Sequence, residues 1–133
     1  MSEWRWLTID VILAIHDEQL AEHGGRPGIR DLGLLESALA RPVNRAAYAA
    51  ATAFDVAAAY AFGIIRDHPF VDGNKRVAFL AAALFLLEQG WEVAATDEAI
   101  VTEMLSLAEG GVEEGAFASW LNQNTRRTGG AGC

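Results

Sequence analysis

The chain has 133 residues, of which 52% are apolar and 21% charged, and this composition suits one folded domain and excludes a disordered chain. The net charge of −8 argues against direct binding to nucleic acid, because proteins that bind it usually carry a basic surface.

Residue usage and hydropathy exclude further classes of protein. The single cysteine, Cys133, forms neither an intrachain disulfide nor a zinc cluster. The N-terminus lacks the apolar region of a signal peptide. The longest apolar run, residues 77–87, is shorter than the roughly 20 residues that a membrane helix needs. We therefore expect a cytoplasmic protein with no membrane partner.

Helix signals recur along the whole chain, and no strand pattern of any length accompanies them. Thr8 fits the N-cap of a first helix, which Gly24 ends. Segment 24–31 contains three glycines and a proline, which predicts a loop. Asp31 is expected to cap a second helix, and Pro42 is expected to end it.

The third helix has clear signals at both ends. Residues 41–51 before it are alanine-rich and fit a loop, a short helix or both. Thr52 and Asp55 then form the pattern of a capping box. The helix must stop near Asp67, because Pro69 disfavours helical angles in the residue before it.

A fourth helix is expected to begin between residues 72 and 74 and to end at Gly90. The third and fourth helices are apolar on every face over residues 56–65 and 77–87, so both should be buried. We predict that they form the centre of an all-α bundle and are joined by the loop between them.

The rest of the chain predicts two more helices and a tail. Residues 91–95 suggest a short extended piece, Thr96 fits the N-cap of a fifth helix, and a sixth covers about 113–124. We therefore predict a compact bundle of about six helices, with one domain over 1–125 and a disordered tail over 126–133.

The charged residues of the central helix pair are gathered in and beside its connecting loop. Charges are rarely buried without partners, so polar groups between two buried helices predict a pocket. Between residues 56 and 87 all the charged residues lie within eleven positions, and they are Arg66, Asp67, Asp72, Lys75 and Arg76.

The start of the fourth helix predicts a phosphate site. The first turn of a helix leaves backbone N–H groups unpaired, so Lys75 and Arg76 are unfavourable there unless an anion binds. Gly73 lets a ligand approach the backbone. Lys75 is also the only lysine in the chain. Free N–H groups, an ammonium and a guanidinium together favour phosphate.

Two further side chains suit phosphoryl chemistry. Asp72 offers a carboxylate to Mg²⁺, which usually binds one or two carboxylates together with phosphate oxygens. His68 is the base suited to neutral pH and would deprotonate an attacking hydroxyl. The structural alternatives are that Asp72 only caps the fourth helix and that His68 only bonds to backbone. A third structural alternative is that Asp67 and Asp72 only neutralise the charges of Lys75 and Arg76, without any ligand.

Segment 68–76, His-Pro-Phe-Val-Asp-Gly-Asn-Lys-Arg, resembles the signature of the Fic/Doc family, which reads HPFx(D/E)GNGRxxR. Lys75 stands in place of the second glycine, which is the form found in the Doc (death-on-curing) branch. Segments 24–31 and 33–42 are also similar to Doc-type toxins. The resemblance covers roughly residues 7–122.

This resemblance implies a fold, an activity and partners. Doc proteins are small helical toxins of toxin–antitoxin pairs, and they transfer the γ-phosphate of ATP to a threonine of elongation factor Tu, which arrests translation. Fic proteins instead transfer AMP to hydroxyls. The partner that the resemblance implies is an antitoxin whose C-terminal segment folds onto the toxin.

The resemblance also implies roles for residues at matching positions. His68 would be the general base and Asp72 the Mg²⁺ ligand, while Lys75 and Arg76 would act in catalysis as well as in binding. The groups that hold the phosphates of ATP would be those of Arg66, Gly73, Asn74, Lys75 and Arg76.

The sequence departs from the family at two positions. Phe79 stands where the Fic pattern has its second arginine, which argues against the pose used for AMP transfer, and Leu80 stands where some Doc proteins have a polar residue. No Ser or Thr is followed four residues later by Glu, so the self-inhibiting segment of many Fic enzymes is missing and an inhibitor would be another chain. AMP transfer and a non-catalytic helical binding module are the alternative functions.

Overall fold

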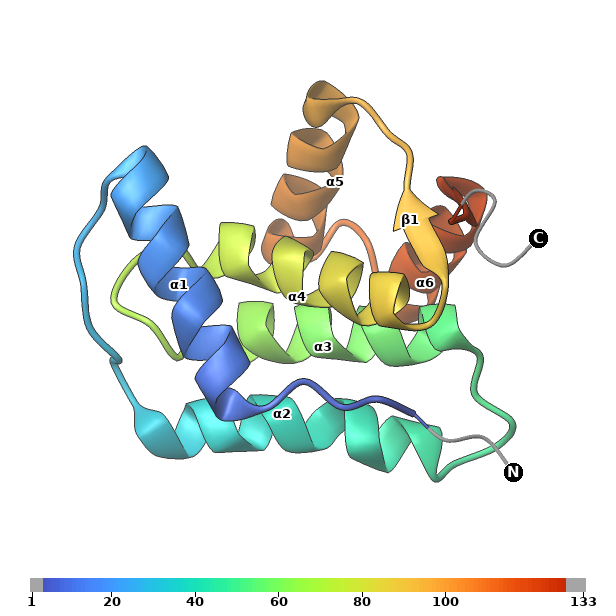
Figure 1. Cartoon of the computed structure of the whole chain (residues 1–133), viewed down its shortest axis with the longest axis horizontal. Helices are drawn as coiled ribbons and strands as arrows, with labels where there is room; N and C mark the ends of the chain where they lie inside the picture. The colour runs from blue at the N-terminus through green and yellow to red at the C-terminus, as the bar shows by residue number, and fades with distance from the viewer. Residues whose placement is uncertain (1–3, 129–133) are drawn as a thin grey trace.

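Six helices and a two-stranded ribbon make up the computed structural model, which describes residues 4–128 (Figure 1). The predicted all-α bundle of about six helices is therefore confirmed. Within residues 4–128, no helix has both the length and the apolar character needed to cross a lipid bilayer. The elements are α1 (Ile9–His23), α2 (Leu32–Ala46), α3 (Ala53–Asp67), α4 (Asn74–Glu88), β1 (Trp91–Val93), α5 (Asp97–Glu109), α6 (Glu114–Gln123) and β2 (Thr125–Arg127).

Threonine side chains begin three of the helices, as the sequence predicts. The hydroxyls of Thr8 and Thr96 each accept a hydrogen bond from the N–H three residues further on, at 3.3 and 3.1 Å. Thr52 and Asp55 form a complete capping box, whose two hydrogen bonds measure 2.9 and 3.1 Å. The predicted starts of α1, α3 and α5 are thus confirmed, because each depends on groups close together in the chain.

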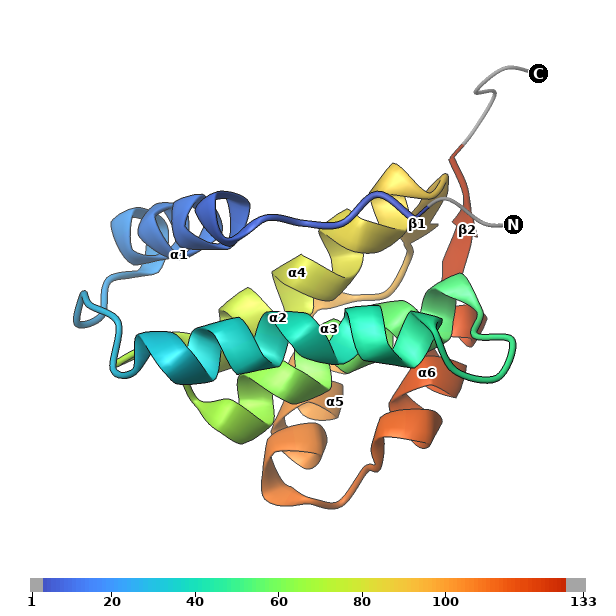
Figure 2. The ribbon, with the colours of Figure 1, turned by 90° about the horizontal axis from the view of Figure 1, so that it is seen from below.

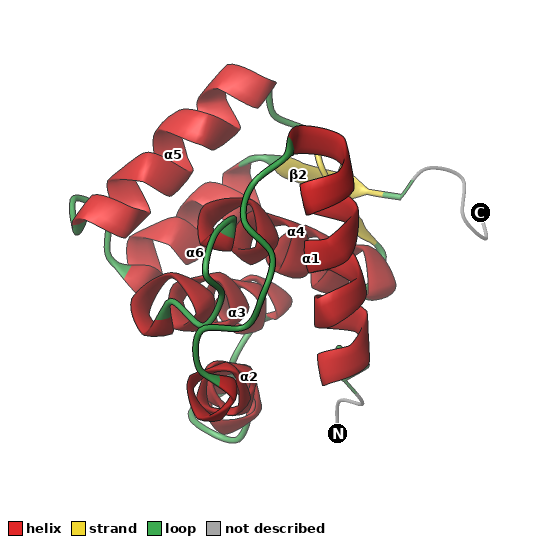
Figure 3. Cartoon of the chain, turned by 90° about the vertical axis from the view of Figure 1, so that its left-hand side faces the viewer, coloured by secondary structure: helices red, strands yellow, loops and turns green. Residues whose placement is uncertain are grey.

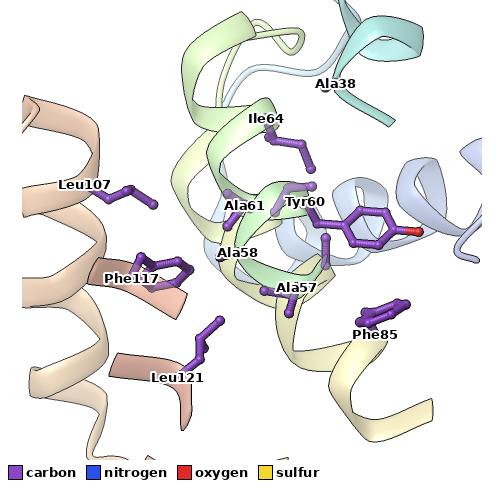
Figure 4. Close-up of a cluster of buried hydrophobic side chains, with 14 of the residues drawn as sticks. Ala38, Ala57, Ala58, Tyr60, Ala61, Ile64, Phe85, Leu107, Phe117 and Leu121 are labelled. Carbon is purple, nitrogen blue, oxygen red and sulfur yellow. The ribbon is translucent and has the colours of Figure 1, made fainter. Parts of the chain in front are cut away.

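Helix α3 lies at the centre and packs against α2, α4 and α6. Figure 2 shows α1 on one side of α2 and α3, and α5 and α6 on the opposite side. In Figure 4, Tyr60 and Phe85 lie on one side of α3, while Leu107, Phe117 and Leu121 approach from the opposite side. All five of these side chains are buried. The predicted burial of the central helix pair is confirmed except at the end of α4, where Leu87 is 51% exposed.

Pro42 does not end α2, contrary to the prediction, but lies inside the helix. Its ring removes the N–H that would otherwise bond to the carbonyl of Ala38. That carbonyl faces α3, where a Cβ built on Gly63 would lie 2.9 Å from the Ala38 oxygen. Close packing against α3 therefore keeps α2 helical on both sides of Pro42. Tertiary packing here overrides the tendency of proline to end a helix.

Arg126 and Arg127 belong to a strand, where the sequence predicts a tail. Strand β2 pairs antiparallel with β1, and Arg127 lies opposite Trp91 with its guanidinium carbon 4.7 Å from the ring centre. A strand of three residues is too short to show a period-2 pattern, so the sequence carries no signal for it. Residues 129–133, with Cys133, lie outside the described residues.

Gly63→Ala is expected to lower the free energy of unfolding by about 1–3 kcal/mol, because the new methyl group would overlap the Ala38 backbone. Gly115→Ala in α6 is the control, since a Cβ there meets nothing within 4 Å. It should be neutral or stabilising by up to about 1 kcal/mol. Urea denaturation measures both changes, and equal stability of Gly63→Ala and the wild type would contradict the close crossing.

Candidate active site

Two loops lie side by side at one end of the bundle (Figures 1 and 3). The covering loop (residues 24–31) joins α1 to α2, and the motif loop (residues 68–73) joins α3 to α4. An antiparallel bridge connects Ile29 to Phe70. The carbonyl of Pro69 accepts the N–H groups of Arg30 and Asp31 from the covering loop, at 2.6 and 3.1 Å. Main-chain hydrogen bonds thus fix the motif loop against a segment about 40 residues earlier in the chain.

His68 ends α3 in the left-handed conformation, with φ 51° and ψ 55°. Pro69 was expected to move this residue away from helical angles, and that expectation is confirmed. A left-handed conformation costs a non-glycine residue about 1–2 kcal/mol. The His68 side chain is exposed, and no hydrogen bond to another group among residues 4–128 holds its imidazole. Its ring is therefore free to contact a substrate, and the alternative of a histidine bonded to backbone is wrong.

Asn74 fixes the shape of the motif loop. Its side chain is almost completely buried, with 4% of the residue exposed. The amide oxygen accepts the N–H of Phe70 at 3.0 Å, and the amide nitrogen donates to the Phe70 carbonyl at 2.9 Å. Because both ends of the side chain bond to the loop, the group that Asn74 can offer an anion is its backbone N–H.

The Asp72 carboxylate is held by backbone N–H groups on both oxygens. Oδ2 accepts from Arg26 at 3.1 Å and Oδ1 accepts from Gly73 at 2.9 Å. These two hydrogen bonds, first that from Arg26, lower the pKa of Asp72, and the charges of Arg26 and Arg76 act in the same direction. Asp72 is also exposed to solvent, which favours the ionised form, so it is a carboxylate at neutral pH.

Close approach of the covering loop to Asp72 requires Gly25. A Cβ built on Gly25 would lie 3.0 Å from Oδ2 of Asp72, and its φ of 123° is one that other residues rarely adopt. Glycine at this position therefore lets the Arg26 N–H reach the carboxylate.

His16 supports the motif loop from α1 and was missed from the sequence. It is 3% exposed, and its ring stacks on Phe70 with centroids 3.9 Å apart. Nε2 lies 2.9 Å from the backbone oxygen of Asp72, and since a carbonyl can only accept, Nε2 carries the proton. One signal was present: His16 lies four residues after the buried Ile12 and so on the inner face of α1.

The N-terminus of α4, where the sequence predicts a phosphate site, has no side-chain cap within residues 4–128. Its N-cap is Gly73, with φ 81°, so the alternative that Asp72 caps the helix is wrong. Lys75 and Arg76 are exposed in the first turn. Cations at this end of a helix are unfavourable by about 0.3–1 kcal/mol each at exposed positions, and a bound anion would reverse that sign.

Asp72 has the chemistry of a Mg²⁺ ligand. Each carboxylate oxygen accepts one N–H and keeps a second acceptor site. In the part of the chain that the structure describes, no three His, Cys, Asp or Glu side chains group closely enough to hold a metal by themselves. A single carboxylate fits Mg²⁺ when phosphate oxygens complete its coordination.

Arg66 lies apart from the other predicted binding residues. Two surface hollows of about 630 and 440 Å³ are found elsewhere on the molecule, and Arg66 lines the second beside the α5–α6 connection. Among residues 4–128, no residue of the motif loop lines either hollow. The expected polar pocket is neither of these hollows, and the exposed polar residues at the loop are His68, Asp72, Lys75 and Arg76.

The fold and the site together define a small helical domain that presents a histidine, a carboxylate and a cationic helix N-terminus from one interhelical loop. Residues 6–86 match the model of the Fic/DOC family, and the chain belongs to this family, as its motif predicts. The chain is 38% identical over 90 residues to "Protein kinase doc" of Escherichia phage P1, a match that covers 67% of this chain and 71% of that protein.

A second relative is "Toxin Doc" of Mycolicibacterium smegmatis (strain ATCC 700084 / mc(2)155). The identity is 44% over 75 residues, and the match covers 54% of this chain and 57% of that protein. Both relatives carry the name of the Doc branch, which agrees with the assignment made from Lys75.

Asn74→Ala is expected to lower the free energy of unfolding by about 1–3 kcal/mol, because it leaves the buried N–H and C=O of Phe70 unpaired. Asn122→Ala on the exposed side of α6 is the control and should stay within about 0.5 kcal/mol of the wild type. Urea denaturation measures both. An Asn74→Ala protein as stable as the Asn122→Ala protein would show that the amide does not hold the loop.

The stability of the protein should fall in acid partly through Asp72. Its pKa is lowered in the folded state, so its contribution is complete above the unfolded pKa of about 3.9 and is lost as pH falls through the folded value. Urea midpoints between about pH 6 and about pH 3 should fall less steeply for Asp72→Asn than for the wild type. Asp17→Asn, at an exposed position in α1, is the control and should keep the wild-type slope.

Proposed function

We propose that this protein is the toxin of a toxin–antitoxin pair and that it transfers the γ-phosphate of ATP, with Mg²⁺, to a threonine hydroxyl of elongation factor Tu. The observation that carries the proposal is the start of α4, where a helix N-terminus without a side-chain cap in residues 4–128 bears exposed Lys75 and Arg76. Polyphosphate is the ligand that relieves both charges. The relatives named as a kinase and a toxin support the same class of function.

In this proposal His68 is the general base. Its neutral imidazole takes the proton of the target hydroxyl as the hydroxyl oxygen attacks the γ-phosphorus. The bond from the γ-phosphorus to the bridging oxygen breaks, and ADP leaves with that electron pair. The transfer is direct in this proposal, because the motif loop contains no Ser, Thr or Cys, and His68 and Asp72 act as base and Mg²⁺ ligand.

The helix N-terminus stabilises the charge on the transferring group. Backbone N–H groups at the start of α4, together with Lys75 and Arg76, donate to the phosphate oxygens as negative charge is redistributed among them. Asp72, kept ionised by its own N–H donors, would hold Mg²⁺ together with phosphate oxygens, and the ion would neutralise further charge. These residues do mainly positioning and electrostatic work, which is what phosphoryl transfer requires.

Phe79 disfavours AMP transfer. It stands where the Fic signature has its second arginine, and its half-buried side chain packs against the hydrophobic core. An apolar ring in that place supplies no charge to seat the outer phosphates of ATP. The orientation of ATP is therefore proposed to be the one that exposes the γ-phosphate to the acceptor.

A cognate antitoxin is the partner that we propose for regulation. The sequence has no Ser or Thr followed four residues later by Glu, the pattern of self-inhibiting segments in Fic enzymes. Inhibition would then come from a disordered antitoxin segment that folds onto the toxin. We propose a cytoplasmic location, since both ATP and elongation factor Tu would be met there.

His68→Ala is expected to slow phosphate transfer to elongation factor Tu by about 10²–10⁴-fold, because the hydroxyl loses its base. Mass spectrometry after incubation with ATP and Mg²⁺ should show one added phosphate for the wild type and for the control His23→Ala, an exposed histidine at the end of α1. Labelled ATP identifies the group, since a γ-label but no α-label should reach the target.

Three outcomes would contradict the proposal. An α-label on the target would mean AMP transfer, and no label with either nucleotide would favour a binding module. Equal toxicity of wild type and His68→Ala on expression without an antitoxin would remove the catalytic role of His68.

A further inference from the structure

Arg30 of the covering loop binds the end of α3. Its Nε donates to the backbone oxygen of His68 at 2.7 Å, and its Nη2 donates to that of Asp67 at 2.8 Å. The last carbonyls of a helix have no partners within the helix and carry partial negative charge. A guanidinium supplies two donors in a fixed plane together with a positive charge, so both hydrogen bonds are charge-assisted.

The backbone of Arg30 is itself held against the motif loop. Its N–H donates to the carbonyl of Pro69 at 2.6 Å, and the neighbouring Ile29 forms the bridge to Phe70. Figure 3 shows the two loops crossing the end of the bundle together. The guanidinium is therefore presented to α3 by a main chain that is already fixed, and this lowers the entropy lost when the two hydrogen bonds form.

We propose that Arg30 is the positioning residue of His68, an inference that rests on the proposed function. His68 occupies a left-handed conformation that a histidine adopts only when its surroundings enforce it. Binding the His68 carbonyl restricts rotation of the peptide that follows it and so fixes the direction of its Cα–Cβ bond. Arg30 acts through the backbone and leaves the imidazole free to meet the target hydroxyl.

A purely structural role for Arg30, as a cap that stabilises α3, is the alternative, and the kinetics distinguish the two. Arg30→Ala should lower kcat for phosphate transfer by about 10- to 100-fold, because displacing a catalytic group by about 1 Å can reduce the rate by that factor. The KM for ATP should change little, since Arg30 contacts α3 and not the start of α4. Arg30→Lys keeps the charge but not the two-pronged donor and should recover only part of the rate.

Arg126→Ala is the matched control, because it removes an exposed arginine whose only ion pair is with exposed Glu92 in the described residues. It should keep the wild-type kcat. In a His68→Ala background, Arg30→Ala should cause no further loss of rate, since a residue that acts through His68 has nothing left to position. Equal losses in both backgrounds, or an unchanged kcat in the single variant, would overturn the proposal.

A measurement independent of activity separates this inference from the proposed function. The one-bond coupling between the amide nitrogen and the Cα of His68, measured by NMR, reports its ψ angle, which sets the direction of the carbonyl that Arg30 binds. Arg30→Ala should move this coupling from its wild-type value, and Arg126→Ala should not. An unchanged coupling in Arg30→Ala would overturn the inference even if phosphate transfer is observed. A changed coupling without any transfer by the wild type would instead show that the proposed function fails.

Discussion

The hydrogen-bonded contact between the side-chain amide of Asn74 and both backbone groups of Phe70 is the interaction on which the site depends. The motif loop reverses the chain between two buried helices, and buried peptide groups in such a turn need partners. One side chain satisfies the two groups of Phe70 and thereby fixes the start of α4 relative to the end of α3. The exposure of His68, Lys75 and Arg76 follows from this tight reversal.

The two helix ends that meet at the motif loop have opposite electrostatic environments. The C-terminal carbonyls of α3 receive the guanidinium of Arg30, whereas the N-terminus of α4 has no side-chain cap from residues 4–128 and carries two cations. The carbonyls at the end of α3 thus have hydrogen-bond partners and a favourable charge. The two cations at the start of α4 are instead electrostatically unfavourable. Unfavourable local arrangements that persist in a well-packed protein tend to occur at functional sites. This contrast is the physical reason for proposing that an anion binds at the start of α4.

The site is assembled from three separate parts of the chain. Asp72 is bonded to the Arg26 N–H from the covering loop and to His16 from α1, which lie 46 and 56 residues away in the sequence. His16 also stacks on the ring of Phe70, the residue whose backbone groups bond to Asn74. The motif loop is therefore supported from its own helix, from α1 and from the covering loop, and its geometry is a property of the whole fold.

The sequence by itself determined the features that depend on neighbouring residues. The caps at Thr8, Thr52 and Thr96 join groups three residues apart, so their patterns were readable, and the family motif identified the residues of the loop. Only the tertiary structure decided the rest. It kept Pro42 inside α2, because α3 packs against the carbonyl that the proline leaves unpaired. It also placed His16 and Arg30 on the motif loop, because helical spacing from Ile12 indicates only that His16 faces inward, and the contacts themselves join segments far apart in the sequence.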